Sequence, residues 1–134
     1  MKGINEIHIK FIDGVQQRYP TCGDYFTSNG IDTITITKQD TPEKNLLIAI
    51  HEFVEWALIT KRGIKESDID AFDIEWNKKA EASNDWFKDD IAPEPGWEPE
   101  CPYGKEHATA EIIERILAQA LDINWIDYDK NLVI

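Results

Sequence analysis

The segment LLIAIHEFVEWALI, residues 46–59, is the most hydrophobic part of the chain and decides its fold. Three polar side chains, His51, Glu52 and Glu55, interrupt the apolar run, and the segment contains no lysine. Burying a carboxylate that has no partner costs several kcal/mol. The acids of this segment therefore need a compensating partner from elsewhere in the protein.

Helix signals surround this segment. Residues 40–43, DTPE, offer an N-cap followed by a proline at the first helical position. At the other end, Lys61 and Arg62 suit the negative end of the helix dipole, and Gly63 suits the position after the last turn. These signals predict a helix over residues 42–62.

On this helix His51 and Glu55 are four residues apart, so their side chains project from one face. Together with Glu52 they form the pattern H-E-x-x-E. In H-E-x-x-H enzymes the first and last residues bind zinc, and the glutamate between them is the general base. Here Glu55 takes the second ligand position, and a carboxylate can also bind zinc. The pattern predicts His51 and Glu55 as metal ligands and Glu52 as the catalytic base.

A third ligand is expected from His107, which follows the proline-rich segment 92–104 and opens a later helix. Two imidazoles and one carboxylate form a ligand set that catalytic zinc sites use, with an open position for water. Glu111 lies four residues after His107 and gives that helix its own metal-competent pair. The four residues predict a site for zinc or another divalent metal, either closed with four ligands or dinuclear with Glu52 as the bridge.

A structural explanation for the same residues stays open. His51 can hydrogen-bond a backbone carbonyl, while Glu52 and Glu55 face solvent along a narrow polar stripe. Asp70 and Asp73 are explained as acids near the start of a helix, favoured by its dipole, or as carboxylates that orient a ligand imidazole.

Alternation of apolar and polar residues predicts β-structure before residue 37. The stretch TITIT at 33–37 is β-branched throughout and is the clearest strand, and it is also the candidate edge strand for a substrate. Turn signals at residues 13–14 and 28–30 separate two or three strands, which we expect to be antiparallel.

Two further helices are expected, one from about Ser67 to Trp86 and Phe87, and one over residues 105–121. The tail, residues 124–134, is expected to add a last strand. The apolar face of the helix over 105–121 is predicted to consist of Ile112, Ile113, Ile116, Leu117, Ala120 and Leu121.

Composition sets limits on function. The chain has 134 residues, 42% hydrophobic residues and a net charge of −12, so we expect one globular domain, residues 1–134, that binds no nucleic acid. The acidity suits solubility, or mimicry of DNA and attraction to a basic partner. No signal peptide or membrane-spanning run is recognisable, which predicts a cytoplasmic protein. Cys22 and Cys101 form no C-x-x-C pair; both are expected to be reduced, although Cys101 is also a candidate soft ligand.

The segments CGDYF, HEFVEW, DAFD and PEPG…CPYGKEH resemble small uncharacterised proteins of bacteriophages and prophages, which share an HE[LF]VE helix and a later P-Y-x-x-x-H. The resemblance covers residues 20 to 111 and implies no activity. More distantly, a strand followed by an H-E-x-x helix resembles the core of zincin metallopeptidases. That resemblance implies His51, Glu55 and His107 as ligands and Glu52 as base; the chain departs from it by having Glu55 in place of the second histidine.

The sequence therefore predicts an α+β domain, zincin-like, in which a small antiparallel sheet packs on about three helices. The first hypothesis for its function is a metal-binding, metallopeptidase-like hydrolase of phage type. The second is a non-enzymatic accessory or anti-defence protein that binds a host factor, with a structural metal or none. The third is an all-helical nucleotide pyrophosphatase with Mg²⁺ on Glu52, Glu55, Asp70 and Asp73, against which the β-rich start and His51 argue.

Overall fold

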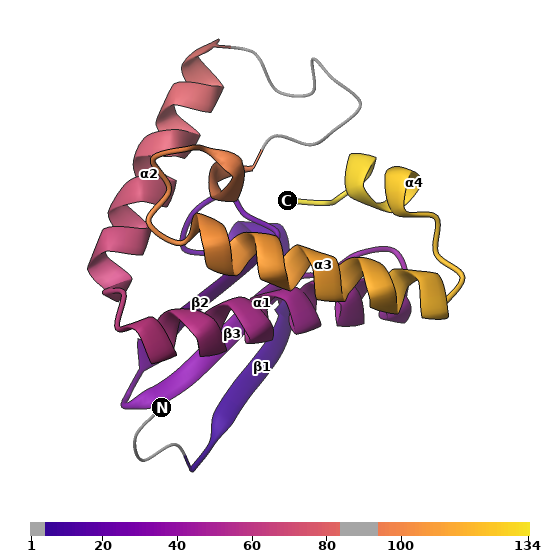
Figure 1. Cartoon of the computed structure of the whole chain (residues 1–134), viewed down its shortest axis with the longest axis horizontal. Coiled ribbons are helices and arrows are strands. Elements are labelled where there is room, and N and C mark those ends of the chain that lie inside the picture. The colour runs from indigo at the N-terminus through magenta and orange to yellow at the C-terminus, as the bar shows by residue number, and fades with distance from the viewer. Residues whose placement is uncertain (1–4, 84–93) are drawn as a thin grey trace.

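A computed structural model of the chain describes residues 5–83 and 94–134 (Figure 1). It shows an α+β protein, as the sequence predicted, with a three-stranded sheet and four helices among the described residues. The strands are β1 (Ile7–Ile12), β2 (Gly23–Ser28) and β3 (Ile31–Thr37), and the helices are α1 (Pro42–Arg62), α2 (Glu66–Ser83), α3 (Gly104–Ala120) and α4 (Trp125–Lys130). Two 3₁₀ turns complete the fold, η1 (Gly14–Gln16) and η2 (Pro95–Trp97).

The sheet has the order β1-β3-β2 and is mixed. β2 and β3 form the antiparallel hairpin that the turn signals predicted, and Asn29 and Gly30 take the positive φ angles, 50° and 75°, of a tight hairpin turn. The expectation of an antiparallel sheet is wrong for β1, which runs parallel to β3. The connection through η1 carries the chain past the central position, which β3 then fills. The stretch TITIT is therefore the central strand and not an edge, so it has no free edge for a substrate.

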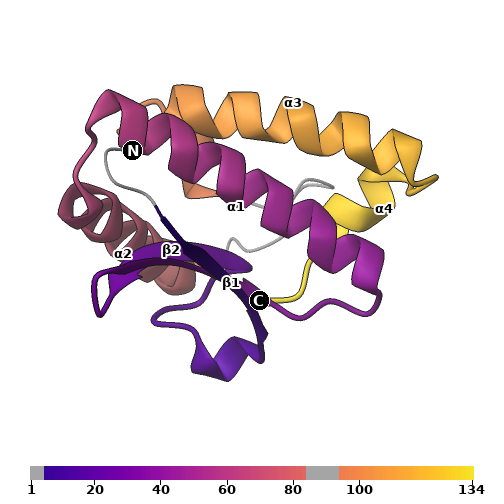
Figure 2. The same ribbon diagram turned by 90° about the horizontal axis from the view of Figure 1, so that it is seen from below.

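α1 lies between the sheet and α3 (Figure 2). Its predicted bounds are confirmed at both ends. The hydroxyl of Thr41 accepts a hydrogen bond from the backbone N–H of Lys44, and Gly63 ends the helix with a left-handed φ of 73°. Ile34 and Ile36 of β3 are completely buried in the core beneath this helix. The same helix buries His51, Glu52 and Glu55, and these are the acids and the imidazole that the sequence left without partners.

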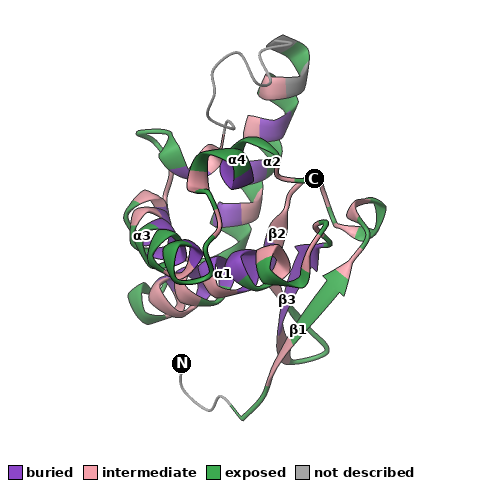
Figure 3. Ribbon diagram, turned by 90° about the vertical axis from the view of Figure 1, so that its right-hand side faces the viewer, coloured by how far each residue is buried: buried purple, intermediate pink, exposed green. Residues whose placement is uncertain are grey.

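α3 runs antiparallel to α1, because its first turn approaches Arg62 through Glu106 whereas Glu114 reaches His51 (Figure 2). The predicted apolar face of this helix is wrong. Ile112 and Ile116 are 60% and 65% exposed. The side that faces α1 is mostly polar; the buried residues of α3 are Glu106, His107, Ala110, Glu111, Glu114 and Ala118 (Figure 3). The reason is that the polar side of α1 needs partners, and only the polar side of α3 supplies them.

Two further predictions concern the second helix and the C-terminal tail. The second helix begins close to its predicted start, and its expected end near Trp86 and Phe87 lies outside the described residues. The tail forms α4 and not a strand, because the Asn124 side chain caps a helical turn by accepting a hydrogen bond from the N–H of Asp127. None of the described helices is long and apolar enough to cross a lipid bilayer.

The inverted face of α3 can be tested by stability. Ile116→Lys places a charge on a side chain that is already in solvent, so we expect the free energy of unfolding to change by less than about 0.5 kcal/mol. Ala118→Leu, on the buried side of the same helix, should cost about 1–3 kcal/mol through overpacking. Urea unfolding of both variants measures the difference. A loss of several kcal/mol in Ile116→Lys alone would show that the isoleucines belong to the core.

Candidate metal centre

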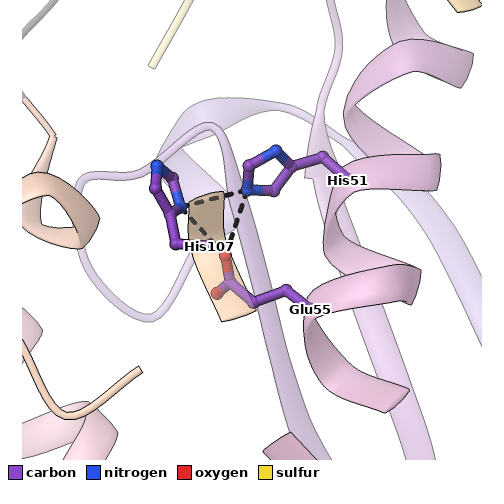
Figure 4. A group of neighbouring side chains, drawn as sticks. All are labelled: His51, Glu55 and His107. Atoms are coloured by element: carbon purple, nitrogen blue, oxygen red, sulfur yellow. Dashed lines mark hydrogen bonds and ion pairs between the residues drawn. The ribbon is translucent and has the colours of Figure 1, made fainter. Parts of the chain in front are cut away.

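Three of the predicted site residues meet in the interface of α1 and α3 (Figure 4). The Oε2 atom of Glu55 lies 3.0 Å from Nε2 of His51 and 3.0 Å from Nδ1 of His107. The two imidazole nitrogens lie 3.2 Å apart. A tetrahedral zinc ion with bonds of about 2.0–2.2 Å places its ligand atoms about 3.3–3.6 Å from one another. The three donor atoms thus form a triangle only a few tenths of an ångström smaller than one face of a zinc tetrahedron.

Outer hydrogen bonds orient two of the three donors toward the centre of this triangle. Nδ1 of His51 lies 2.7 Å from Oε1 of Glu114, and the hydroxyl of Tyr128 donates to the other oxygen of Glu114 at 2.6 Å. The hydroxyl of Tyr25 donates to Oε1 of Glu55 at 2.8 Å. Nε2 of His51 and Oε2 of Glu55 are therefore left facing each other. Carboxylate–histidine pairs of this kind orient the ligands of metal sites.

The loop that carries η2 positions His107. Nε2 of His107 lies 2.8 Å from Oε2 of Glu94, although neither atom makes a hydrogen bond of good geometry with the described residues. Gly96 packs directly on the imidazole: a Cβ atom at this position would lie 2.3 Å from Cγ of His107. Only glycine allows the loop to approach this closely, and the loop in turn holds the ring against α1.

Electrostatics place protons on the imidazoles of the metal-free cluster. Burial by itself lowers the pKa of His107, but its interactions with Glu55 and Glu94 outweigh burial and raise the pKa to about 10. The pKa of His51 is raised in the same way by Glu114 and Glu55 against the effect of burial. Burial raises the pKa of Glu55, yet the two imidazoles overcome it and lower that pKa to about 2. A metal ion bound here must displace the imidazole protons.

Glu52 lies beside the cluster but is not part of it. Its side chain is buried, packs against Gly23, and makes no hydrogen bond with the other described residues. Burial, followed by the charge of Glu55, raises the pKa of Glu52 well above its usual value. Burial makes this carboxylate a stronger base once it is ionised, and a cation bound by the adjacent ligand set would favour the ionised form.

The fourth predicted ligand, Glu111, is not among the converging donors. It is buried, and its carboxylate lies 3.5 Å from Nη2 of Arg115 on the same helix. Burial and the charge of Glu94 raise its pKa to about 7. The α3 carboxylate that reaches the cluster is Glu114, which sequence reasoning missed. A signal was available, because residues 107, 111 and 114 follow helical spacing and share one face.

The remaining candidates do not join the cluster. Asp70 pairs with Arg18 at 3.0 Å, and Asp73 accepts hydrogen bonds from the hydroxyls of Tyr19 and Tyr103. Neither orients a ligand imidazole, and the sheet contradicts the all-helical fold of the pyrophosphatase hypothesis. Cys101 is a free, half-buried thiol outside the donor set.

A cavity of about 110 Å³ opens beside the cluster. Its lining includes the three donor residues, Glu52 and Gly23. This volume is sufficient for several water molecules or for a small group of a ligand. The ligand set and the unpaired carboxylate of Glu52 therefore line the same cavity, and this cavity has room for a reactant.

Comparison of the chain with protein-family models, with curated proteins and with solved structures gives no match. The resemblances to phage proteins and to zincins therefore stay predictions.

The close contact of Gly96 with His107 generates a sharp test. In Gly96→Ala the new methyl group overlaps the imidazole and must displace it, so we expect zinc affinity to fall at least tenfold. Gly104→Ala is the matched control, because a Cβ atom there meets nothing closer than 3.5 Å. Competition with a chromogenic chelator measures both affinities. Equal zinc affinities of Gly96→Ala and the native protein would argue against His107 as a ligand.

The proton distribution predicts how the stability of the metal-free protein depends on pH. A folded-state pKa of about 10 for His107 lies above the unfolded value of about 6.5. Its stabilisation is therefore complete below pH 6.5 and is lost as the pH rises toward 10. The contribution of Glu55 is present above about pH 4.5 and is lost as the pH falls toward 2.

Metal-stripped protein should therefore be more stable at pH 5.5 than at pH 8.5. Asp73 and Glu111, whose pKa values are raised to about 7, act in the same direction across this range. Urea unfolding at the two pH values measures the effect. Equal or greater stability at pH 8.5 would mean that the imidazoles of the folded protein are neutral.

Proposed function

We propose that the chain is a zinc-dependent hydrolase with a zincin-like arrangement of ligands and base. The observation that supports this proposal is the placement of Glu52, buried and unpaired, on the same cavity as the converging donors of His51, Glu55 and His107. Two imidazole nitrogens and one carboxylate oxygen favour zinc over magnesium, which prefers oxygen ligands and retains water.

His51, Glu55 and His107 would hold the ion, and the ion would supply Lewis-acid polarisation of a carbonyl and activation of water. Glu52 would accept the proton of the attacking water and deliver it to the leaving group. Glu114 holds His51 by its Nδ1 atom, and Tyr25 holds Glu55 by its outer oxygen. Both contacts keep the donor atoms in place while charge changes at the reacting centre.

The position of β2 supports a substrate with an extended backbone. β2 is an edge strand of the sheet, and its residues Gly23 and Tyr25 contact Glu52 and Glu55. A strand so close to the proposed base and ligand gives an extended chain a direction along which to lie. Hydrolysis of a peptide or a related amide is therefore the reaction class that we favour.

Two variants distinguish the proposed base, Glu52, from Glu111, which is a buried acid outside the donor set. Glu52→Gln keeps the shape of the side chain but cannot accept a proton, so bound zinc and melting temperature should stay unchanged while hydrolysis falls by about 10²–10⁴-fold. Glu111→Gln, the matched control on the facing helix, should keep both zinc and activity. The measurements are elemental analysis of protein purified without a histidine tag and a broad peptidase and esterase screen. Loss of zinc in Glu52→Gln would instead assign Glu52 as a ligand or bridge.

The exposed apolar stripe on α3 favours a second candidate function. Ile112, Ile113 and Ile116 are solvent-exposed on a protein of net charge −12, and apolar surface of this kind is common in binding proteins. In this alternative the chain is a non-enzymatic accessory protein of phage type that binds a host factor, and the cluster holds a structural metal or none. Stoichiometric zinc without hydrolysis in the native protein would favour this alternative.

A further inference from the structure

A second group of residues, three of them aromatic, lines the cavity in addition to the metal cluster. It consists of Tyr19, Asp73, Trp76, Asn77 and Tyr103, which come from the loop before β2, from α2 and from the residue before α3. We call these five residues the aromatic wall. The proposed hydrolase uses none of them, although they line the same space as Glu52 and the donor residues.

The cavity is lined by more acidic than basic groups. Six side-chain carboxyl groups line it, together with the imidazoles of His51 and His107, and no lysine or arginine does so among the described residues. One of the six, Asp24, is neutralised from outside by Arg18, whose Nε lies 2.7 Å from Oδ2 of Asp24. A divalent ion would take the place of the two imidazole protons, so in either state two positive charges would face the remaining five acidic groups. Phosphate or carboxylate groups are therefore disfavoured as ligands, whereas a cation is attracted.

The aromatic wall combines a carboxylate with aromatic side chains. Asp73 is held at its centre, because its two oxygens accept hydrogen bonds from the hydroxyls of Tyr103 at 2.5 Å and Tyr19 at 3.1 Å. The indole N–H of Trp76 donates to Glu98, and the amide nitrogen of Asn77 donates to the backbone oxygen of Asp73. The hydroxyl groups of Tyr19 and Tyr103 thus fix two aromatic rings beside Asp73, and the indole of Trp76 lines the same cavity. The side-chain oxygen of Asn77 remains able to accept a hydrogen bond. Aromatic faces together with a carboxylate attract ammonium groups by cation–π and charge interactions.

We propose that the aromatic wall binds a primary ammonium group of the substrate. The inference rests on the proposed hydrolase function and narrows its substrate class to amides that carry an ammonium group near the bond to be cleaved. Two sources share this chemistry, the amino terminus of a peptide and the side chain of a basic residue. The wall would hold the ammonium group while the carbonyl faces the cluster and Glu52.

The test uses n-butylammonium as the probe, with n-butanol and butyrate as neutral and anionic counterparts of the same length. Two-dimensional NMR of the native protein, metal-free and zinc-loaded, should show saturable shifts around the wall with n-butylammonium. Binding of butanol should be at least tenfold weaker, and butyrate should not bind. Equal binding of butanol, or no saturable binding of n-butylammonium, would overturn the proposal.

Substitutions in the aromatic wall test whether n-butylammonium binds there. Asp73→Asn should weaken n-butylammonium at least tenfold, whereas Glu75→Gln, an exposed carboxylate two residues further on the same helix, should leave it unchanged. Trp76→Leu tests the aromatic contribution separately and serves if Asp73→Asn fails to fold. Unchanged affinity in both wall variants would contradict the assignment.

The outcome also separates this inference from the proposed function. Ammonium binding by a protein without zinc or hydrolysis would support the wall and overturn the hydrolase. Hydrolysis that proceeds equally with neutral and ammonium-bearing amides would support the hydrolase and overturn the wall. Comparison of glycine methylamide with Nα-acetyl-lysine methylamide as ligands then assigns the ammonium group to an amino terminus or to a side chain.

Discussion

The interface of α1 and α3 depends on one pairing, in which the buried carboxylate of Glu55 is shared by the imidazoles of His51 and His107. All three side chains are at least nine-tenths buried, so bulk water stabilises their charges little. Removing one partner from a buried pair typically costs about 3–5 kcal/mol, because the other charge is left uncompensated. The position of α3 against α1 is therefore set by charge compensation more than by apolar contact.

That constraint explains why α3 appears inverted. An amphipathic helix ordinarily turns its apolar stripe toward the core, but the core side of α1 already carries His51, Glu52 and Glu55. Turning the isoleucines of α3 inward would leave these groups without partners, at a greater free-energy cost than exposing apolar side chains. The helix instead buries His107 and Glu114 and leaves Ile112 and Ile116 in solvent.

The same contrast shows what the sequence can and cannot predict. The ends of α1 were predictable because the capping residues Thr41, Pro42 and Gly63 act locally. His51 and Glu55 were predictable as a pair because four-residue spacing fixes their common face. Periodicity, however, defines a face without saying which way it points, so the inward side of α3 was not predictable from its apolar pattern. Parallel pairing of β1 and the approach of Glu94 to His107 depend on long-range contacts that no local signal encodes.

The chemistry of the cluster restricts which ion it could bind. Without metal, its carboxylates hold protons on both imidazoles, and their hydrogen bonds satisfy the donor atoms. An entering ion competes with those protons and must replace the hydrogen bonds with stronger coordination. Zinc binds imidazole nitrogen strongly enough for this exchange, with binding free energies of about 10–16 kcal/mol in structural sites. Magnesium gains little from nitrogen ligands and gives up its water reluctantly. If the cluster binds a metal, its protonated and hydrogen-bonded state would therefore favour strongly coordinating ions such as zinc over weakly coordinating ions such as magnesium.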